Sequence, residues 1–310
     1  MANTLRDLRR KMKGITSTKH VTHAMELVAA SKMRRAVQSA QQLRRYALLA
    51  WRMLQTIATL NPGLHPFLTE QEPRKVLIIL FSSDRGLCGS LNTQLFRAAT
   101  QYVQSLQSLR SFESVSFIAV GRKAQQFLAR SKQRVLAAFP ALSNHPTSRD
   151  VRPIVTMAAE AFLKSEADHV VLLYADFVSA LVQEPSIKLL FPLSETELRE
   201  MIRTLPQRSR KSEIEPATKN QKPITQEYLF EPSPEQVLST VLPQLTHVQV
   251  YQAVLESAAS EHSARMVAMR NANDNASSIL DDLTLTYNQT RQANITAELA
   301  ELSASKAALE

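Results

Sequence analysis

The chain has 310 residues, of which 44% are hydrophobic and 21% charged, and it carries a formal net charge of +9. These proportions are ordinary for a folded, water-soluble protein and exclude a wholly disordered chain. The longest purely apolar run, Val76 to Phe81, is short, and the N-terminus is rich in arginine and lysine. We therefore expect neither a membrane span nor a secretory signal peptide. The single cysteine, Cys88, cannot form an internal disulfide.

The positive charge is concentrated at one end of the chain. Residues 1–52 contain 12 Lys and Arg against 2 Asp and Glu, whereas residues 245–310 contain 4 against 8. The two ends are therefore electrostatically complementary. Because the basic end has the larger excess, the sequence also predicts an acidic partner outside the chain.

The two ends of the chain have few helix breakers. Proline is absent before Pro62 and after Pro243, and glycine is absent after Gly121. Continuous helices over residues 1–61 and 244–310 would be roughly 90 Å and 100 Å long, at about 1.5 Å per residue. Such long helices need a partner for their apolar stripes, and each can serve the other. The sequence predicts a shaft of two antiparallel helices with a compact body between their inner ends.

Both helices carry apolar residues at alternating steps of three and four, the pattern of a coiled coil. The N-terminal seam is predicted to contain Leu5, Leu8, Met12, Ile15, Val21, Met25, Val28 and Leu43. The C-terminal seam is predicted to contain Val248, Tyr251, Leu255, Ala258, His262, Met266, Met269, Ala276, Leu280, Leu283 and Tyr287. Polar residues interrupt both seams, which predicts a weakly held pair: Lys19, Glu26, Asn273 and Asn294.

Between the helices the pattern changes to short β-rich runs separated by helical segments. The strands are expected at Lys75–Phe81, Val115–Val120, Val135–Phe139 and His169–Tyr174, with an edge strand at Ile187–Phe191. The helices are expected at Asn92–Ser108, Lys123–Ser131 and Ile154–Lys164. This alternation indicates a Rossmann-like α/β body with a largely parallel sheet.

The predicted fold class is thus a mixture of a long antiparallel coiled coil and a central α/β domain. We place the N-terminal helix at 1–61, the body at 73–232 with a charged, proline-rich insert at 194–232, and the C-terminal helix at 233–310.

The turn after the first strand, residues 82–89, has the position of a phosphate-binding loop but not its sequence. It matches neither G-x-x-x-x-G-K-[ST] nor G-x-G-x-x-G, so a structural turn is the better interpretation. Cys88 in this turn is expected to be a small buried residue and not a nucleophile, because the nearest histidines in sequence are remote. The histidines show no metal-ligand spacing. We expect no cofactor and no metal.

Several segments resemble the gamma subunit of the rotary (F-type) ATP synthase. Met25 to Met33, MELVAASKM, resembles the family's N-terminal signature, and Ser83 to Gly89, SDRGLCG, resembles its middle motif. In the C-terminal helix, ARMVAM at 264–269, DLTLTYN at 282–288 and RQANITAEL at 291–299 are similar to the same family. The similarity extends over nearly the whole chain in the family's order.

This resemblance implies a non-catalytic rotor in the central stalk. Its helical pair would turn inside a ring of alpha and beta subunits, and its body would lie with the epsilon subunit on the c-ring, at the cytoplasmic face of the membrane. The resemblance assigns contacts with the beta subunits to Met25, Lys32, Arg34, Arg35, Arg265, Gln292, Thr296 and Glu298. It assigns contacts near the c-ring and epsilon to Tyr228 and Glu231.

Two other functions are compatible with parts of the sequence. One is an α/β nucleotide-binding enzyme with helical arms, against which the missing phosphate loop argues. The other is a coiled-coil protein that binds nucleic acid through its basic helix, which would show steeply salt-dependent DNA binding.

Overall fold

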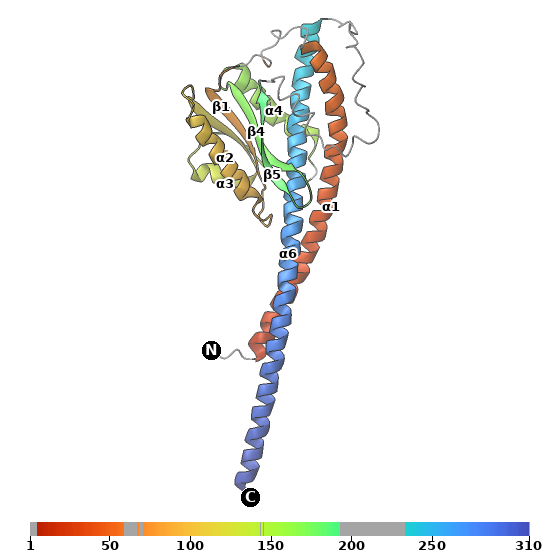
Figure 1. The fold of residues 1–310 in the computed structure, drawn as a ribbon, viewed down its shortest axis with the longest axis vertical. Coiled ribbons are helices and arrows are strands. Elements are labelled where there is room, and N and C mark those ends of the chain that lie inside the picture. Colours follow the sequence, from red (N-terminus) through yellow and green to blue (C-terminus); the bar gives the residue numbers. More distant parts are fainter. Residues whose placement is uncertain are drawn as a thin grey trace, which may run out of the picture.

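The computed structural model describes residues 5–58, 67, 71–142, 144, 146–192 and 233–309. A long helical shaft carries an α/β body on one side, close to one end (Figure 1). The helices are α1 (Leu5–Ala58), α2 (Leu91–Gln107), α3 (Arg122–Arg130), α4 (Ser148–Leu163) and α6 (Pro234–Leu309). The strands are β1 (Lys75–Phe81), β2 (Ser114–Val120), β3 (Val135–Phe139), β4 (His169–Phe177) and β5 (Gln183–Phe191). The predicted fold class is confirmed, whereas the three domain limits stay a prediction because residues 61 and 194–232 lie outside the described residues.

The body is one five-stranded sheet in the order β3-β2-β1-β4-β5. The first four strands are parallel and β5 is antiparallel at the edge. The edge strand begins at Gln183, earlier than predicted, and runs through Pro185. Proline is acceptable there because an edge strand has one row of backbone groups without a strand partner.

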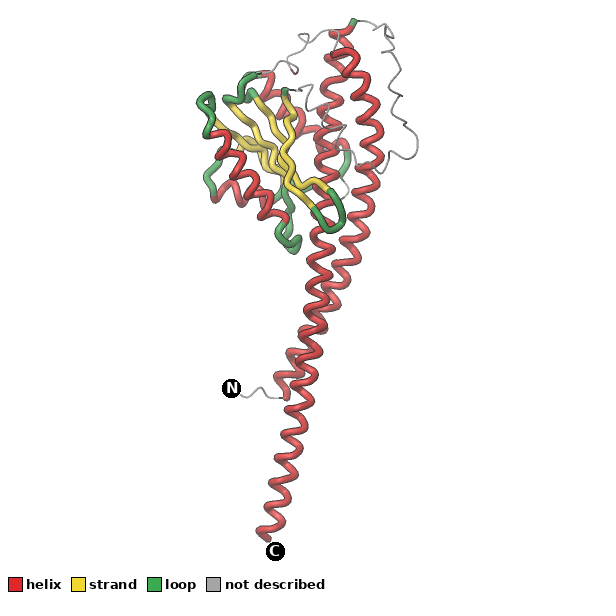
Figure 2. Tube along the Cα trace, in the orientation of Figure 1, coloured by secondary structure: helices red, strands yellow, loops and turns green. Residues whose placement is uncertain are grey.

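Both faces of the sheet are covered, which explains why its central strands are apolar without alternation. In β1, Val76, Ile78 and Leu80 pack toward α2 and α3. The alternate residues Leu77, Ile79 and Phe81 pack in a second core with α4 and the first half of α6. Figure 2 shows the two layers of helices on either side of the strands. The shaft helix α6 is therefore also a structural layer of the body.

The helix α6 begins at Pro234, close to the predicted limit of 233, and contains Pro243 in its interior, ahead of the breaker-free stretch 244–310. An internal proline removes one helical hydrogen bond and normally kinks or ends a helix. Here Leu242 and Leu245, on either side of it, are buried in the body core. Their burial outweighs the local cost, so the helix continues.

The helices α1 and α6 run antiparallel and pack along most of α1. Arg9 donates a hydrogen bond of 2.6 Å to the Tyr287 hydroxyl, and Glu26 lies 3.7 Å from Arg270. Farther along, Ala36 packs on α6 close to the body. The pairing of the two ends of the chain is as predicted.

The seam of α1 differs from the prediction in its middle. Val21 and Val28 were predicted to face the partner helix but are each 55% exposed. The buried residues are instead Thr22, Ala29 and Ala36, which follow one another at seven-residue spacing. Small side chains let the two helices approach closely, and the larger valines are turned outward.

Candidate interaction surface

A groove of about 590 Å³ lies where α1, α6 and the turn after β1 meet. Its walls include three of the residues assigned from the sequence, Met25 and Lys32 on α1 and Arg265 on α6. Arg265 is far from Met25 and Lys32 in the chain, and the antiparallel helical pair brings it close to them. Val28 and Leu87, both largely exposed, add an apolar wall.

Arg265 is held in place by other parts of the chain. Its guanidinium lies 2.7 Å from the Glu261 carboxylate, one helical turn earlier, and the two side chains are 13% and 8% exposed. The same guanidinium donates a 3.4 Å hydrogen bond to the backbone oxygen of Gly86. Arg265 therefore joins α6 to the turn after β1 and leaves a small part of its side chain at the groove surface.

The other walls of the groove are also tied together. Lys32 Nζ donates a 2.7 Å hydrogen bond to Asn144 Oδ1, in the connection between β3 and α4. Asp84 Oδ1 accepts hydrogen bonds from the backbone nitrogens of Arg122 and Ala141, at 2.9 Å and 3.1 Å. The turn after β1 is thus fixed by contacts on several sides. It forms a rigid wall and not a free loop.

The groove is richer in cations than in anions. Lys32, Arg85, Arg122 and Arg265 line it, against Asp84 and Glu261. Since Glu261 already pairs with Arg265, the remaining field favours acidic groups from a partner. Sequence reasoning missed Asn144 and Glu261, although the four-residue spacing of Glu261 and Arg265 on a helix is a signal for an ion pair.

Arg34 and Arg35 lie on the exposed surface of α1 and do not line the groove. Together with Lys32 they form what we call the basic cluster. The predicted contacts at Tyr228 and Glu231 lie outside the described residues.

The end of α6 extends past the start of α1, and its side chains from Arg291 to Ser305 are all exposed (Figure 1). Three residues of this tip were assigned to partner contacts, and we call them the tip residues: Gln292, Thr296 and Glu298. The Thr296 hydroxyl donates a 2.9 Å hydrogen bond to the backbone oxygen of Gln292. Large apolar residues also face solvent here, among them Ile295, Leu299 and Leu302. A free helix end of this kind can enter a partner without rearranging the rest of the chain.

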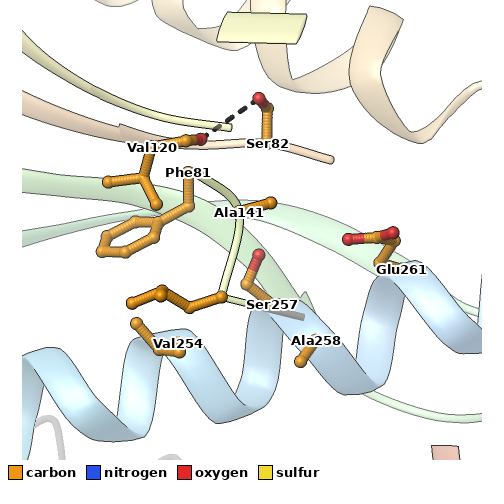
Figure 3. A pocket seen from close by; sticks show the side chains of 9 residues that line it. Phe81, Ser82, Val120, Ala141, Val254, Ser257, Ala258 and Glu261 are labelled. Carbon is orange, nitrogen blue, oxygen red and sulfur yellow. Dashed lines mark hydrogen bonds between the residues drawn. The ribbon is translucent and has the colours of Figure 1, made fainter. Parts of the chain in front are cut away.

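At the carboxyl edge of the sheet, where doubly wound α/β proteins bind nucleotides, α6 closes the space directly beneath the strand ends. The space between Ser82, Ala141 and Ser257 measures about 10 Å³, and Figure 3 shows Ser257 of α6 pointing toward Ala141. This volume is that of about one water molecule. This space is therefore too small for a nucleotide. The larger groove at the turn after β1 has the room, but its turn lacks a phosphate-loop sequence.

The turn that follows β1 has a structural role. Gly121 after β2 has a φ of +98°, and a Cβ at this position would overlap the carbonyl oxygen of Ser82. Cys88 is buried beside Ser83 and Asn92, and burial raises the pKa of its thiol. A protonated, enclosed thiol is a poor nucleophile. The described residues contain no group of three or more His, Cys, Asp or Glu side chains placed to hold a metal ion.

Comparison with known proteins identifies the family. A family profile described as ATP synthase matches residues 4–309. The ATP synthase gamma chain of Roseiflexus castenholzii is 38% identical over 307 residues, with 98% of each chain covered. That of Cupriavidus necator is 36% identical over 310 residues, with both chains covered completely. The chain belongs to the ATP synthase gamma-chain family. The predicted resemblance is confirmed.

Solved structures show the same fold at lower identity. A chain of the Euglena gracilis mitochondrial ATP synthase, from a structure of OSCP, F1 and c-ring, aligns with a TM-score of 0.61 and 18% identity, covering 98% of this chain and 94% of that one. A chain of the Tetrahymena thermophila mitochondrial ATP synthase central stalk and c-ring gives a TM-score of 0.56 and 22% identity, covering 81% of this chain and 99% of that one.

Membership of this family settles two expectations. A gamma chain is a stalk subunit of the F1 sector, and catalysis belongs to the beta subunits, so the chain is not the catalytic subunit. Among the described helices, none has the length and apolar character needed to cross a membrane.

Proposed function

We propose that the chain is the central-stalk rotor that couples ion-driven rotation of a membrane c-ring to ATP synthesis or hydrolysis in a ring of alpha and beta subunits. The single observation that carries this function is the shaft itself, a long helical pair with an exposed helix end on one side and an α/β body near the other end (Figure 1). The complex would lie at the cytoplasmic face of the membrane, with the chain as a peripheral component.

The body end of the shaft is proposed to meet the c-ring and the epsilon subunit. This places Tyr228 and Glu231, which precede the start of α6 in sequence, on the membrane side. The groove and the tip would then face the alpha and beta subunits.

The groove is proposed to receive acidic loops of the beta subunits. Met25 and Lys32 line it from α1, and the exposed Arg34 and Arg35 extend the positive surface beyond it. Arg265 would contribute mainly by holding the turn at Gly86 in place, because little of its side chain reaches the surface.

The composition of the shaft surface suits a part that turns among equivalent partners. Exposed charge pairs contribute about 0–1 kcal/mol each, which is enough to guide a position but not to trap it. The tip residues are polar and exposed, and they can form and break hydrogen bonds with successive subunits at similarly small cost.

The basic cluster provides the test. Replacing Lys32, Arg34 and Arg35 with glutamine in the assembled complex should alter complex yield or ATPase rate, and the effect should shrink as salt shortens the Debye length toward about 3 Å near 1 M. A matched control removes three exposed cations of the body by the substitutions Arg97→Gln, Arg110→Gln and Arg130→Gln.

If both triple variants follow the wild type at every ionic strength, the basic cluster is an ordinary solvated surface and its proposed contacts are wrong. If the chain does not co-purify with alpha and beta subunits but binds DNA with a steep salt dependence, the rotor function itself is wrong.

A further inference from the structure

The interface between α6 and the sheet contains a buried carboxylate. Glu256 is 2% exposed and points from α6 toward β4 and β5. Its Oε2 accepts a 2.9 Å hydrogen bond from the Tyr174 hydroxyl and lies 3.9 Å from Lys188 Nζ. Its Oε1 accepts a 2.9 Å hydrogen bond from the Gln252 side chain. Both oxygens of the carboxylate are therefore satisfied by directed contacts.

The network is compact and mutually supporting. The Lys188 ammonium also lies 5.2 Å from the centre of the Tyr174 ring, in the range of a cation–π contact. Burial and the neighbouring Glu256 charge raise the pKa of Tyr174 well above its usual value, so its hydroxyl stays a proton donor. Tyr174 and Lys188 come from β4 and β5, and Gln252 and Glu256 from α6. The network thus joins two strands to the shaft helix.

The rest of this interface is mostly small and apolar. Val250, Ala253 and Val254 of α6 belong to the core that it shares with the sheet. Apolar burial holds such surfaces together but has no preferred direction, so it resists separation better than it resists rolling or sliding. Hydrogen bonds depend on angle as well as distance, and they fix orientation.

Weaker polar contacts lie on both sides of the network. Toward the tip, the Ser263 hydroxyl donates a 2.6 Å hydrogen bond to the backbone oxygen of Ala180, between β4 and β5. On the α4 side, the Tyr251 hydroxyl donates a 3.1 Å hydrogen bond to the backbone oxygen of Pro146, and Ser148 shares a 2.7 Å hydrogen bond with His247. These contacts are half-buried or exposed, whereas the Glu256 network is almost fully enclosed.

The helix α6 is the main mechanical link between the shaft and the body. It packs on β4, β5 and α4, whereas α1 packs chiefly on α6. Two helices alone form a thin rod that can twist, and packing α6 on a sheet stiffens the part of the shaft that lies beside the body (Figure 1). Most of the described packing between the shaft and the body lies in this interface, so it carries most of any torque between them.

We propose that Glu256 is a positioning residue for energy coupling, which locks α6 to the sheet through Tyr174, Lys188 and Gln252 so that body and shaft turn as one unit. This inference rests on the proposed rotor function. Without the network, the interface keeps its apolar contacts and the chain still assembles. However, α6 can then shift relative to the sheet when torque acts on the shaft.

The test uses the complete ATP synthase complex reconstituted into vesicles, carrying Glu256→Gln, Tyr174→Phe or both. Glutamine keeps the shape of the side chain but removes the charge, and phenylalanine keeps the ring and removes the hydroxyl. Each change should increase the equilibrium constant for local opening of the α6–sheet interface by about tenfold. A hydrogen bond to a buried charged group contributes roughly that factor. The exposed Glu160→Gln on α4, whose carboxylate pairs with Lys164, is the matched control.

Two quantities are measured, the ratio of ATP-driven proton uptake to ATP hydrolysis and the hydrogen exchange of α6 near Glu256. The variants should hydrolyse ATP but show a lower ratio of proton uptake to hydrolysis, and α6 should exchange faster near Glu256, while the control matches the wild type. The double variant should lose less than the sum of the two single variants, because both substitutions act on the hydrogen bond between Tyr174 and residue 256.

An unchanged uptake-to-hydrolysis ratio, with either fast or slow exchange, would overturn the proposal, and so would a lower ratio without faster exchange. If Glu256→Gln does not assemble, Tyr174→Phe decides by the same criteria. A wild-type complex that builds no ion gradient during ATP hydrolysis would instead contradict the proposed function, so the two failures are distinguishable.

Discussion

Two arginines of α6 form ion pairs in different environments. Comparing them measures how burial changes the contribution of an ion pair to the free energy of unfolding. Arg265 pairs with Glu261 at 2.7 Å, with side chains 13% and 8% exposed. Arg270 pairs with Glu26 at 3.7 Å, with side chains 71% and 17% exposed, so solvent screens the cation of this pair. Replacing each arginine with methionine keeps most of the aliphatic stem and removes the charge, so the two variants differ mainly in the environment of the pair.

The expected costs are very different. Arg265→Met leaves the enclosed Glu261 carboxylate without its closest cation and should lower the free energy of unfolding by about 3 kcal/mol. Arg270→Met removes a solvent-screened pair and should change it by less than about 0.5 kcal/mol. Arg265→Met also removes the contact with Gly86, so the turn after β1 should loosen.

Urea unfolding of the full chain measures both effects. We take the free energy of unfolding to fall by about 2 kcal/mol per molar urea. The urea concentration at the unfolding midpoint should then decrease by roughly 1–2 M for Arg265→Met and stay nearly constant for Arg270→Met. Adding Glu261→Gln to Arg265→Met should restore part of the loss, because the unpaired buried charge is then gone. Equal shifts for the two arginine variants would refute the reasoning, since burial would then have no effect on the pair.

Three further outcomes are expected. Alanine at all three tip residues should impair ATPase and proton pumping of the complex while the circular dichroism of the isolated chain stays unchanged; full turnover would remove these residues from the contact. Gly121→Ala should lower the free energy of unfolding by more than about 1 kcal/mol, because φ is positive and the new Cβ overlaps Ser82, whereas Gly86→Ala, in open space, is the control in urea unfolding. Burial raises the pKa of Cys88 above 9.0 and that of Tyr174 well above 10.0, so the folded state holds these protons longer than the unfolded state. The free energy of unfolding should therefore fall as pH rises above about 9, and a pH series with Cys88→Ser should show a shallower fall; an identical slope would contradict the assignment.

The sequence by itself determined the two long helices, their antiparallel pairing and the α/β alternation of the body. These features depend on local information: the absence of breakers over long stretches, the three-and-four spacing of apolar residues and the short β-branched runs. The motifs at Met25–Met33 and Ser83–Gly89 were sufficient to indicate the family.

The tertiary structure alone decided which residues face one another. Val21 and Val28 have the hydrophobicity of seam residues, but the close approach of α6 selects the smaller Thr22 and Ala29, and that choice depends on the distance between the helices. The groove that joins Lys32 to Arg265, and the network that joins Tyr174 to Glu256, connect residues distant in sequence. Periodicity along one segment contains no information about such pairs, because they arise only when α6 packs on the sheet and on α1 at the same time.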